Sequence, residues 1–212
     1  MSVVAIAGGL VTLPLLGFSL VAVALIVERL LFWGRVNRRQ RPVIRQLLQV
    51  YASDPLQARE YLRQQHRLPI ARIFLAALEL PEPTPEEFRL ALESAAQAEL
   101  PILKRFNTAF ETIVSAAPLL GLLGTILGLM RAFANLTLGN LGGTATAEVT
   151  TGISEALVST VFGLVVAIVT LLFANLFRSL YQRQLAFIQE RGGQLELLYR
   201  RYHEPGRRGF KG

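Results

Sequence analysis

One acidic residue stands alone in a long uncharged stretch near the middle of the chain. Glu155 is the only charged residue between positions 150 and 177. Hydroxyl groups that could serve it are carried by Thr151 and Ser159, which share its helical face, and by Thr125 and Thr160. A carboxyl group in a low-dielectric setting favours its neutral form, so it could change protonation state near neutral pH. Glu155 is therefore a candidate proton carrier, because acids at membrane depth usually serve a function.

Two alternatives stay open for these residues. Glu155 could instead cap the start of a helix in contact with water on the outer side of a membrane. Thr125 and Thr160 could simply donate to the carbonyl one turn back in their own helices, as buried threonines often do. Spacing by itself does not choose between these roles.

Three apolar stretches must position these groups, and each is long enough to cross a bilayer. The sequence predicts three spans, within residues 1–33, 113–133 and 150–177. Arginines follow the first and third spans, whereas the connection 134–149 has neither Lys nor Arg. The positive-inside rule then places the N-terminus and this connection outside, and residues 34–112 and 178–212 in the cytoplasm. The third span is expected to continue as a helix through Leu198.

Small residues recur on the second and third spans at steps of three and four. They include Gly121, Gly124 and Gly128 on the second span, and Gly152 and Gly163 on the third. Residues of this size let helix backbones approach closely in lipid, where apolar burial does not drive association. The pattern predicts that these glycines form the contact between the two spans.

The cytoplasmic segment 34–112 carries the start and stop signals of several helices. Asp54 precedes Pro55 and fits a helix cap, and a short helix is expected over Ile70–Leu80. Thr84 fits a capping box that opens a further helix. We expect that helix to run into the second span, with a kink at Pro101.

Composition excludes several other functions. The chain has 22 basic and 15 acidic residues, a net charge of +7 and a mean hydropathy of +0.41. Because the basic residues gather at the ends of apolar stretches, the surplus suits anionic membrane lipid rather than nucleic acid. There is no Cys, and His66 and His203 are far apart, so no metal site is expected. Without a nucleophile–base pair or a phosphate-binding loop, neither an enzyme nor a bound cofactor is predicted, and protons are the expected coupling ion.

Two motifs in this chain are similar to those of a known family. The stretches are APLLGLLGTILGLM at Ala117–Met130 and GISEALVSTVFGL at Gly152–Leu164. They resemble the second-span and third-span motifs of the MotA/TolQ/ExbB proton-channel family. By motif position, the resemblance implies that Glu155 is the pore glutamate and that Thr125 and Thr160 are pore-lining threonines.

The resemblance also implies an architecture and partners. Three spans resemble ExbB and TolQ rather than MotA, which has four, so an all-α integral membrane protein of the bacterial inner membrane is expected, with its N-terminus in the periplasm and C-terminus in the cytoplasm. Its copies would form a pentameric homo-oligomeric ring around single-span helices of an ExbD- or TolR-like protein. The second and third spans would line the ring, and the first would face lipid.

The expected activity follows from the same resemblance. The ring would use the proton motive force to drive work at the outer membrane through a TonB- or TolA-like protein. An ExbB-like role in TonB-dependent transport is expected. A TolQ-like role in the Tol-Pal envelope system, or a membrane scaffold that conducts no protons, stays open.

Overall fold

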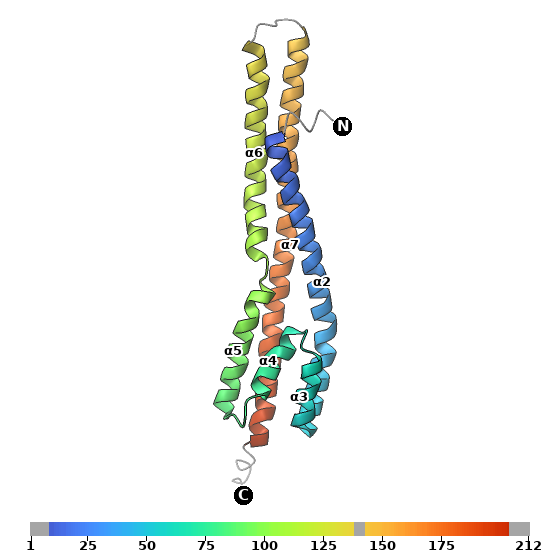
Figure 1. Cartoon of the computed structure of the whole chain (residues 1–212), viewed down its shortest axis with the longest axis vertical. Coiled ribbons are helices and arrows are strands. Elements are labelled where there is room, and N and C mark those ends of the chain that lie inside the picture. Colours follow the sequence, from blue (N-terminus) through green and yellow to red (C-terminus); the bar gives the residue numbers. More distant parts are fainter. Residues whose placement is uncertain (1–8, 138–142, 204–212) are drawn as a thin grey trace. The chain divides into compact units, whose positions relative to one another are not determined.

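The computed structural model describes residues 9–137 and 143–203, with side chains for 11–133, 150, 152–154 and 156–202. All regular secondary structure in these ranges is α-helical (Figure 1). The helices are α2 (Gly9–Ser53), α3 (Pro55–Gln64), α4 (Pro69–Leu78), α5 (Pro85–Leu103), α6 (Asn107–Thr137) and α7 (Gly143–His203). Among the described residues, three helical stretches are long and apolar enough to cross a membrane, in α2, in α5 with α6, and in α7. The predicted all-α class with three apolar helices is thus confirmed.

Two of the helices are longer than their apolar parts. Helix α2 has 45 residues and continues past residue 33, where the first span was expected to end, through Ser53. Helix α7 has 61 residues and runs past Leu198 to His203. The connection expected at 134–149 contains the end of α6 and the start of α7, and residues 138–142 lie outside the described ranges.

The helix expected to kink at Pro101 is in fact broken, which corrects that prediction. Pro101 has no N–H, and its ring crowds the preceding turn, so it weakens the end of α5. Helix α5 ends at Leu103, where the Lys104 N–H donates to the Leu100 carbonyl at 2.9 Å. Phe106 then takes a left-handed backbone angle, with φ of 69°. A left-handed residue cannot continue a right-handed helix, so α6 starts afresh at Asn107.

The chain divides into two compact units. The first, here called the apolar unit, contains the N-terminal part of α2 through Arg29, together with Phe106–Phe177. Among its described residues, seven buried ones form a core: Val11, Leu15, Ala22, Ile113, Ala117, Val166 and Ala167. They come from α2, α6 and α7, so all three helices contribute to one cluster.

The second, here called the polar unit, contains Leu30–Arg105 and the rest of the chain from Arg178. Its largest fully buried side chains include Leu47, Leu62, Ile70, Ile73, Phe74, Phe88, Leu103 and Leu195. Helix α4 packs against both α3 and α5. Arg72 of α4 pairs with Glu99 of α5 through both guanidinium Nε, at 2.6 Å from Oε1, and Nη2. This hydrogen bond with Glu99 raises the pKa of Arg72 above its usual value.

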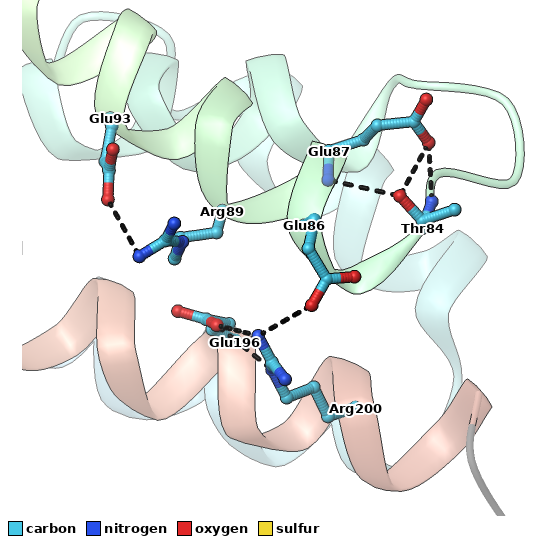
Figure 2. Close-up of polar contacts among 7 residues, drawn as sticks. All are labelled: Thr84, Glu86, Glu87, Arg89, Glu93, Glu196 and Arg200. Carbon is cyan, nitrogen blue, oxygen red and sulfur yellow. Dashed lines mark hydrogen bonds and ion pairs between the residues drawn. The ribbon is translucent and has the colours of Figure 1, made fainter.

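The caps predicted for the polar unit are confirmed. The Asp54 carboxylate accepts hydrogen bonds from the N–H groups of Leu56 and Gln57, at 2.9 and 3.2 Å. Thr84 forms the capping box with Glu87, since each side chain accepts from the other residue's N–H (Figure 2). These bonds satisfy backbone donors that the first turn of a helix leaves unpaired.

The start of α5 is also fastened to the end of α7. The Phe88 and Tyr199 rings stack with centroids 4.2 Å apart, and the Tyr199 hydroxyl donates to the Pro83 carbonyl. Arg200 of α7 lies between Glu196 of its own helix and Glu86 of α5 (Figure 2). The C-terminal end of α7 is thus part of the fold of the polar unit.

Candidate functional site

Helices α6 and α7 meet in the apolar unit through small residues, and they run in opposite directions. Gly128 faces Ala156, and a side chain at Gly128 would place its Cβ 2.7 Å from that of Ala156. At Gly163 the Cβ would lie 2.5 Å from the Ala117 carbonyl oxygen, closer than real contacts allow. Both positions therefore require glycine if the backbones are to stay this close.

The other three predicted packing glycines lie on the same contact. A Cβ on Gly121 would lie 3.0 Å from the backbone of Thr160, and one on Gly152 would lie 3.0 Å from Ala132 Cβ. A Cβ on Gly124 would collide with the side chain of Ser159. The structure thus brings together all five glycines that the sequence singled out.

Two hydroxyl groups of α7 converge on a single carbonyl of α6. Thr160 Oγ1 donates to the Gly121 oxygen at 2.9 Å, and Ser159 Oγ lies 3.2 Å from the same oxygen. Ser159 Oγ is also 2.7 Å from the Ala156 carbonyl, so its one proton has two acceptors within reach. The absence of a Cβ at Gly121 is what exposes this carbonyl to the neighbouring helix.

Thr125 behaves differently from Thr160. Its hydroxyl donates to the Leu122 carbonyl of its own helix at 2.6 Å. This is the local bond that the sequence left open as an alternative for both threonines. In this arrangement Thr160 joins the two helices, whereas the Thr125 proton stays within α6, and both oxygens keep lone pairs that can accept a further hydrogen bond.

The backbone of Glu155 lies well inside α7. The helix starts at Gly143, so residue 155 is about 18 Å along it at the usual rise per residue. Glu155 therefore does not cap the start of α7, because the first turn lies far before it, while its contact with water on the outer side stays an open alternative. Its neighbour Ala156 is buried against Gly128, and Ser154 on the other side is exposed. The Glu155 side chain itself lies outside the described set, as does that of Thr151.

Helix α2 contributes to the surroundings of this contact. Val11 and Leu15 are buried in the core of the apolar unit, and a Cβ on Gly124 would lie 3.5 Å from Val11 Cγ1. The first span thus packs beside the stretch of α6 that carries Thr125. Its opposite face, with Leu13 and Leu20, is left exposed.

The sequence did not anticipate the part that Ser159 plays in joining the helices. It was noted only as a hydroxyl on the face of Glu155, although its position next to Thr160 in a stripe of small residues was a usable signal. Thr170 was not singled out either; it is almost fully buried and donates to the Val166 carbonyl at 2.7 Å. Within the described residues, no group of three or more His, Asp or Glu side chains is placed to hold a metal ion.

Comparison with known proteins gives a family match. The profile of the MotA/TolQ/ExbB proton channel family matches residues 65–190. This range includes α4, α5, α6 and most of α7, and with them every residue of the α6–α7 contact described above.

Proteins similar to this chain occur in Synechocystis and in Methanothermobacter thermautotrophicus. A Synechocystis protein named as biopolymer transport protein ExbB-like 3 is 63% identical over 93% of this chain and 94% of its own length. ExbB-like 1 of Synechocystis is 42% identical over 93% of this chain and 79% of its own. An ExbB homologue of Methanothermobacter thermautotrophicus is 29% identical over 76% of this chain and 57% of its own. The similarity to the first two extends over nearly the whole chain, beyond the two motifs.

Proposed function

The chain belongs to the MotA/TolQ/ExbB proton channel family, and from this premise we propose that it is the ring-forming subunit of a proton-driven motor in a bacterial inner membrane. In the proposed assembly, a pentameric ring surrounds the single-span helices of an ExbD- or TolR-like protein. The N-terminus lies in the periplasm and the C-terminus in the cytoplasm. The work is passed to the outer membrane by a TonB- or TolA-like protein.

The observation that carries this proposal is the place of Glu155. It lies inside an apolar helix of membrane-spanning length, next to a residue that packs directly against α6. An ionised carboxylate left unpaired at such a depth is costly, so a protein that keeps one there has a use for its change of charge. The glycine contact holds the backbone around it in one place.

The mechanism we propose follows from what lies between Glu155 and the other end of the span. The segment from Val161 to Val169 has only apolar residues and one glycine, so no side chain there can pass a proton onward. Glu155 would take up a proton from the outer side and stay neutral while it faces an apolar surface. It would release the proton when an acidic group of the partner helix, or water admitted by it, came within reach. Relative movement of ring and partner would then be tied to each proton.

The hydroxyls of Ser159 and Thr160 would have a supporting role. Because the Thr160 proton is given to the Gly121 carbonyl at 2.9 Å, its oxygen is left as an acceptor. The neighbouring Ser159, which shares the helical face of Glu155, could accept a hydrogen bond from a protonated carboxyl or from water on that face. We propose that these hydroxyls hold α7 against α6 and favour the neutral carboxyl, without carrying the proton themselves.

The decisive experiment replaces Glu155 by Gln, which keeps size and hydrogen bonding but cannot ionise. The variant is expected to reach the membrane and assemble as the parent does, yet to lose proton-driven function, and Glu155→Asp is expected to retain part of it. The measurement is energy-dependent outer-membrane uptake in a strain lacking related genes, with membrane levels checked for each variant.

The outcomes of that experiment separate the alternatives. Full uptake with Glu155→Gln would rule out the proton-carrier role and leave a scaffold. An ExbB-like role predicts that the parent chain restores uptake in a strain lacking ExbB; rescue only of a strain lacking TolQ would assign it to the Tol-Pal system instead.

A further inference from the structure

The exposed face of α2 changes its chemistry abruptly along the helix. Leu13, Leu20 and Leu31 are 71%, 74% and 60% exposed and give this face an apolar surface. From residue 35 onward the same face carries arginine. Its exposed members are Arg35, Arg38, Arg41 and Arg45, here called the arginine face.

The two parts belong to one face because they share the seven-residue register of a helix. Leu31, Arg38 and Arg45 follow one another at steps of seven residues, about two turns, so they lie on nearly the same side of α2. A surface that meets lipid over its first part therefore continues directly into cationic side chains. The change occurs within one helical turn, between Leu31 and Arg35.

The arginine face has no internal compensation. The sequence has no Asp or Glu between Arg29 and Asp54. Among the residues that the structure describes, Arg38, Arg41 and Arg45 form no ion pair, whereas Arg63, Arg72 and Arg200 of the polar unit each have a glutamate partner. Like charges at steps of three and four repel each other on a helix. Such a face is stabilised by an anionic partner.

The direction of the side chains indicates which partner. Side chains on a helix lean toward its N-terminus, and on α2 that direction leads back to the apolar stretch. Arg35 shows this, since its Nε donates to the Leu31 carbonyl at 3.2 Å. At about 1.5 Å per residue, Arg35 and Arg38 lie about 6 and 10 Å below Leu31, and Arg45 lies about 21 Å below it. Only the first two can reach the headgroup layer, because charges act over about 8 Å in physiological salt.

We propose that Arg35 and Arg38 bind the headgroup phosphates of an anionic phospholipid at the end of the first span. The planar guanidinium fork suits phosphate oxygens, and its weak hydration lowers the cost of leaving bulk water. This inference rests on the membrane span that the proposed function requires, but it needs no proton transport. The continuous exposed face favours lipid over an acidic protein segment, since the apolar part of that face requires an apolar neighbour as well.

The test places a fluorescent reporter on this face. Trp33, the only tryptophan of the chain, is replaced by Phe, and Leu31→Trp puts a single tryptophan on the exposed side one turn above Arg35. The full-length protein is reconstituted in phosphatidylcholine vesicles that contain an equal minor fraction of brominated phosphatidylglycerol or brominated phosphatidylcholine. Bromine quenches tryptophan at short range, so the ratio of the two quenching strengths measures the local preference for the anionic lipid.

Brominated phosphatidylglycerol is expected to quench more strongly, and the excess should shrink as salt is added. Removing both charges in Arg35→Gln/Arg38→Gln should lower the preference by up to about fivefold for each arginine. The matched variant Arg41→Gln/Arg45→Gln removes the same charge from the same face farther from the bilayer, and should retain most of the preference.

Three results would overturn the proposal. Equal quenching by the two lipids would show that the face does not select anionic headgroups. An excess that survives Arg35→Gln/Arg38→Gln would place the selectivity elsewhere. A tryptophan at position 31 that neither lipid quenches would show that protein covers this face, either an acidic partner or another copy of the chain.

Discussion

The helices within each of the two units are packed together by opposite kinds of residue. In the apolar unit the closest contacts between helices are made by Gly121, Gly128, Ala156 and Gly163, which have almost no side chain. In the polar unit the buried core is made of large side chains such as Phe74 and those packed around α4. The helices of the apolar unit come close because side chains are small or missing, whereas those of the polar unit pack through large buried side chains.

The difference reflects the solvent each unit is built for. In water, burying a large apolar side chain is favourable because it removes apolar surface from water. In lipid that gain disappears, because the acyl chains are as apolar as leucine. Association then depends on close backbone packing and on hydrogen bonds such as that from Thr160 to the Gly121 carbonyl. The same substitution should therefore have opposite consequences in the two units.

The largest effect is expected from removing atoms in the polar unit. Phe74 is fully buried, so Phe74→Ala should destabilise the protein by about 3–5 kcal/mol through lost burial and the cavity left behind. The measurement is thermal loss of the helical circular-dichroism signal of the full chain in detergent.

A matched truncation in the apolar unit is the control. Leu122 is 52% exposed on α6, so Leu122→Ala should change stability by no more than about 0.5 kcal/mol. If both truncations had the same effect, the contrast between the units would not hold.

The next effect comes from adding a single methyl group to α7. Gly163→Ala forces a Cβ to within 2.5 Å of the Ala117 carbonyl, which only a shift of the backbones can relieve. Overfilling of this kind costs about 1–3 kcal/mol. It should weaken assembly in native mass spectrometry and lower the unfolding temperature.

The same substitution in the other unit should do the reverse. A Cβ on Gly192 meets nothing within 4 Å, so Gly192→Ala should stabilise the same helix by up to about 1 kcal/mol through helix propensity alone. Equal destabilisation by both changes would mean that the cost of a Cβ in α7 does not depend on the unit in which the glycine lies, and that lipid packing is not the cause.

The smallest effect tests the hydrogen bond between the helices. Thr160→Val removes the donor to Gly121 and should weaken the α6–α7 contact by about 0.6–1.7 kcal/mol, the range for such bonds in membranes. Thr125→Val removes only a bond within α6 and should leave the contact intact. Proton-driven uptake should fall with Thr160→Val without being abolished. If Thr125→Val weakened assembly as much as Thr160→Val does, the bond from Thr160 to Gly121 would not be what holds the two helices together.

Much of this architecture could be predicted from local sequence. The spans follow from apolar length, the caps at Asp54 and Thr84 from residue type and a neighbouring proline, and the small-residue stripes from their spacing. Each of these signals lies within a few residues of the feature it predicts. That is why the capping bonds are found where they were expected.

Other features depend on contacts that no local pattern records. Pro101 predicts an interruption of the helix, but α5 ends only at Leu103. The turn after it depends on the left-handed backbone of Phe106. The Arg72–Glu99 pair joins residues that are 27 positions apart. Each lies in a segment whose sequence predicts an amphipathic helix, without indicating the partner. Likewise, whether a threonine bonds its own helix or its neighbour is decided by the register between helices.

The convergence of Ser159 and Thr160 on the Gly121 carbonyl has a mechanical consequence. If α7 slid along α6 by one turn, about 5.4 Å, the place of Thr160 would be taken by Ala156 or Leu164, and neither side chain can donate a proton. The same step would put Ser159 or Ala167 in the place of Gly163 beside the Ala117 carbonyl, where a Cβ has no room. Sliding is thus blocked both by the loss of the hydrogen bond and by a steric clash, so the two helices behave as a single rigid pair. In the proposed motor, any movement would then come from the α6–α7 pair tilting or turning as a whole, or from the proposed partner helix.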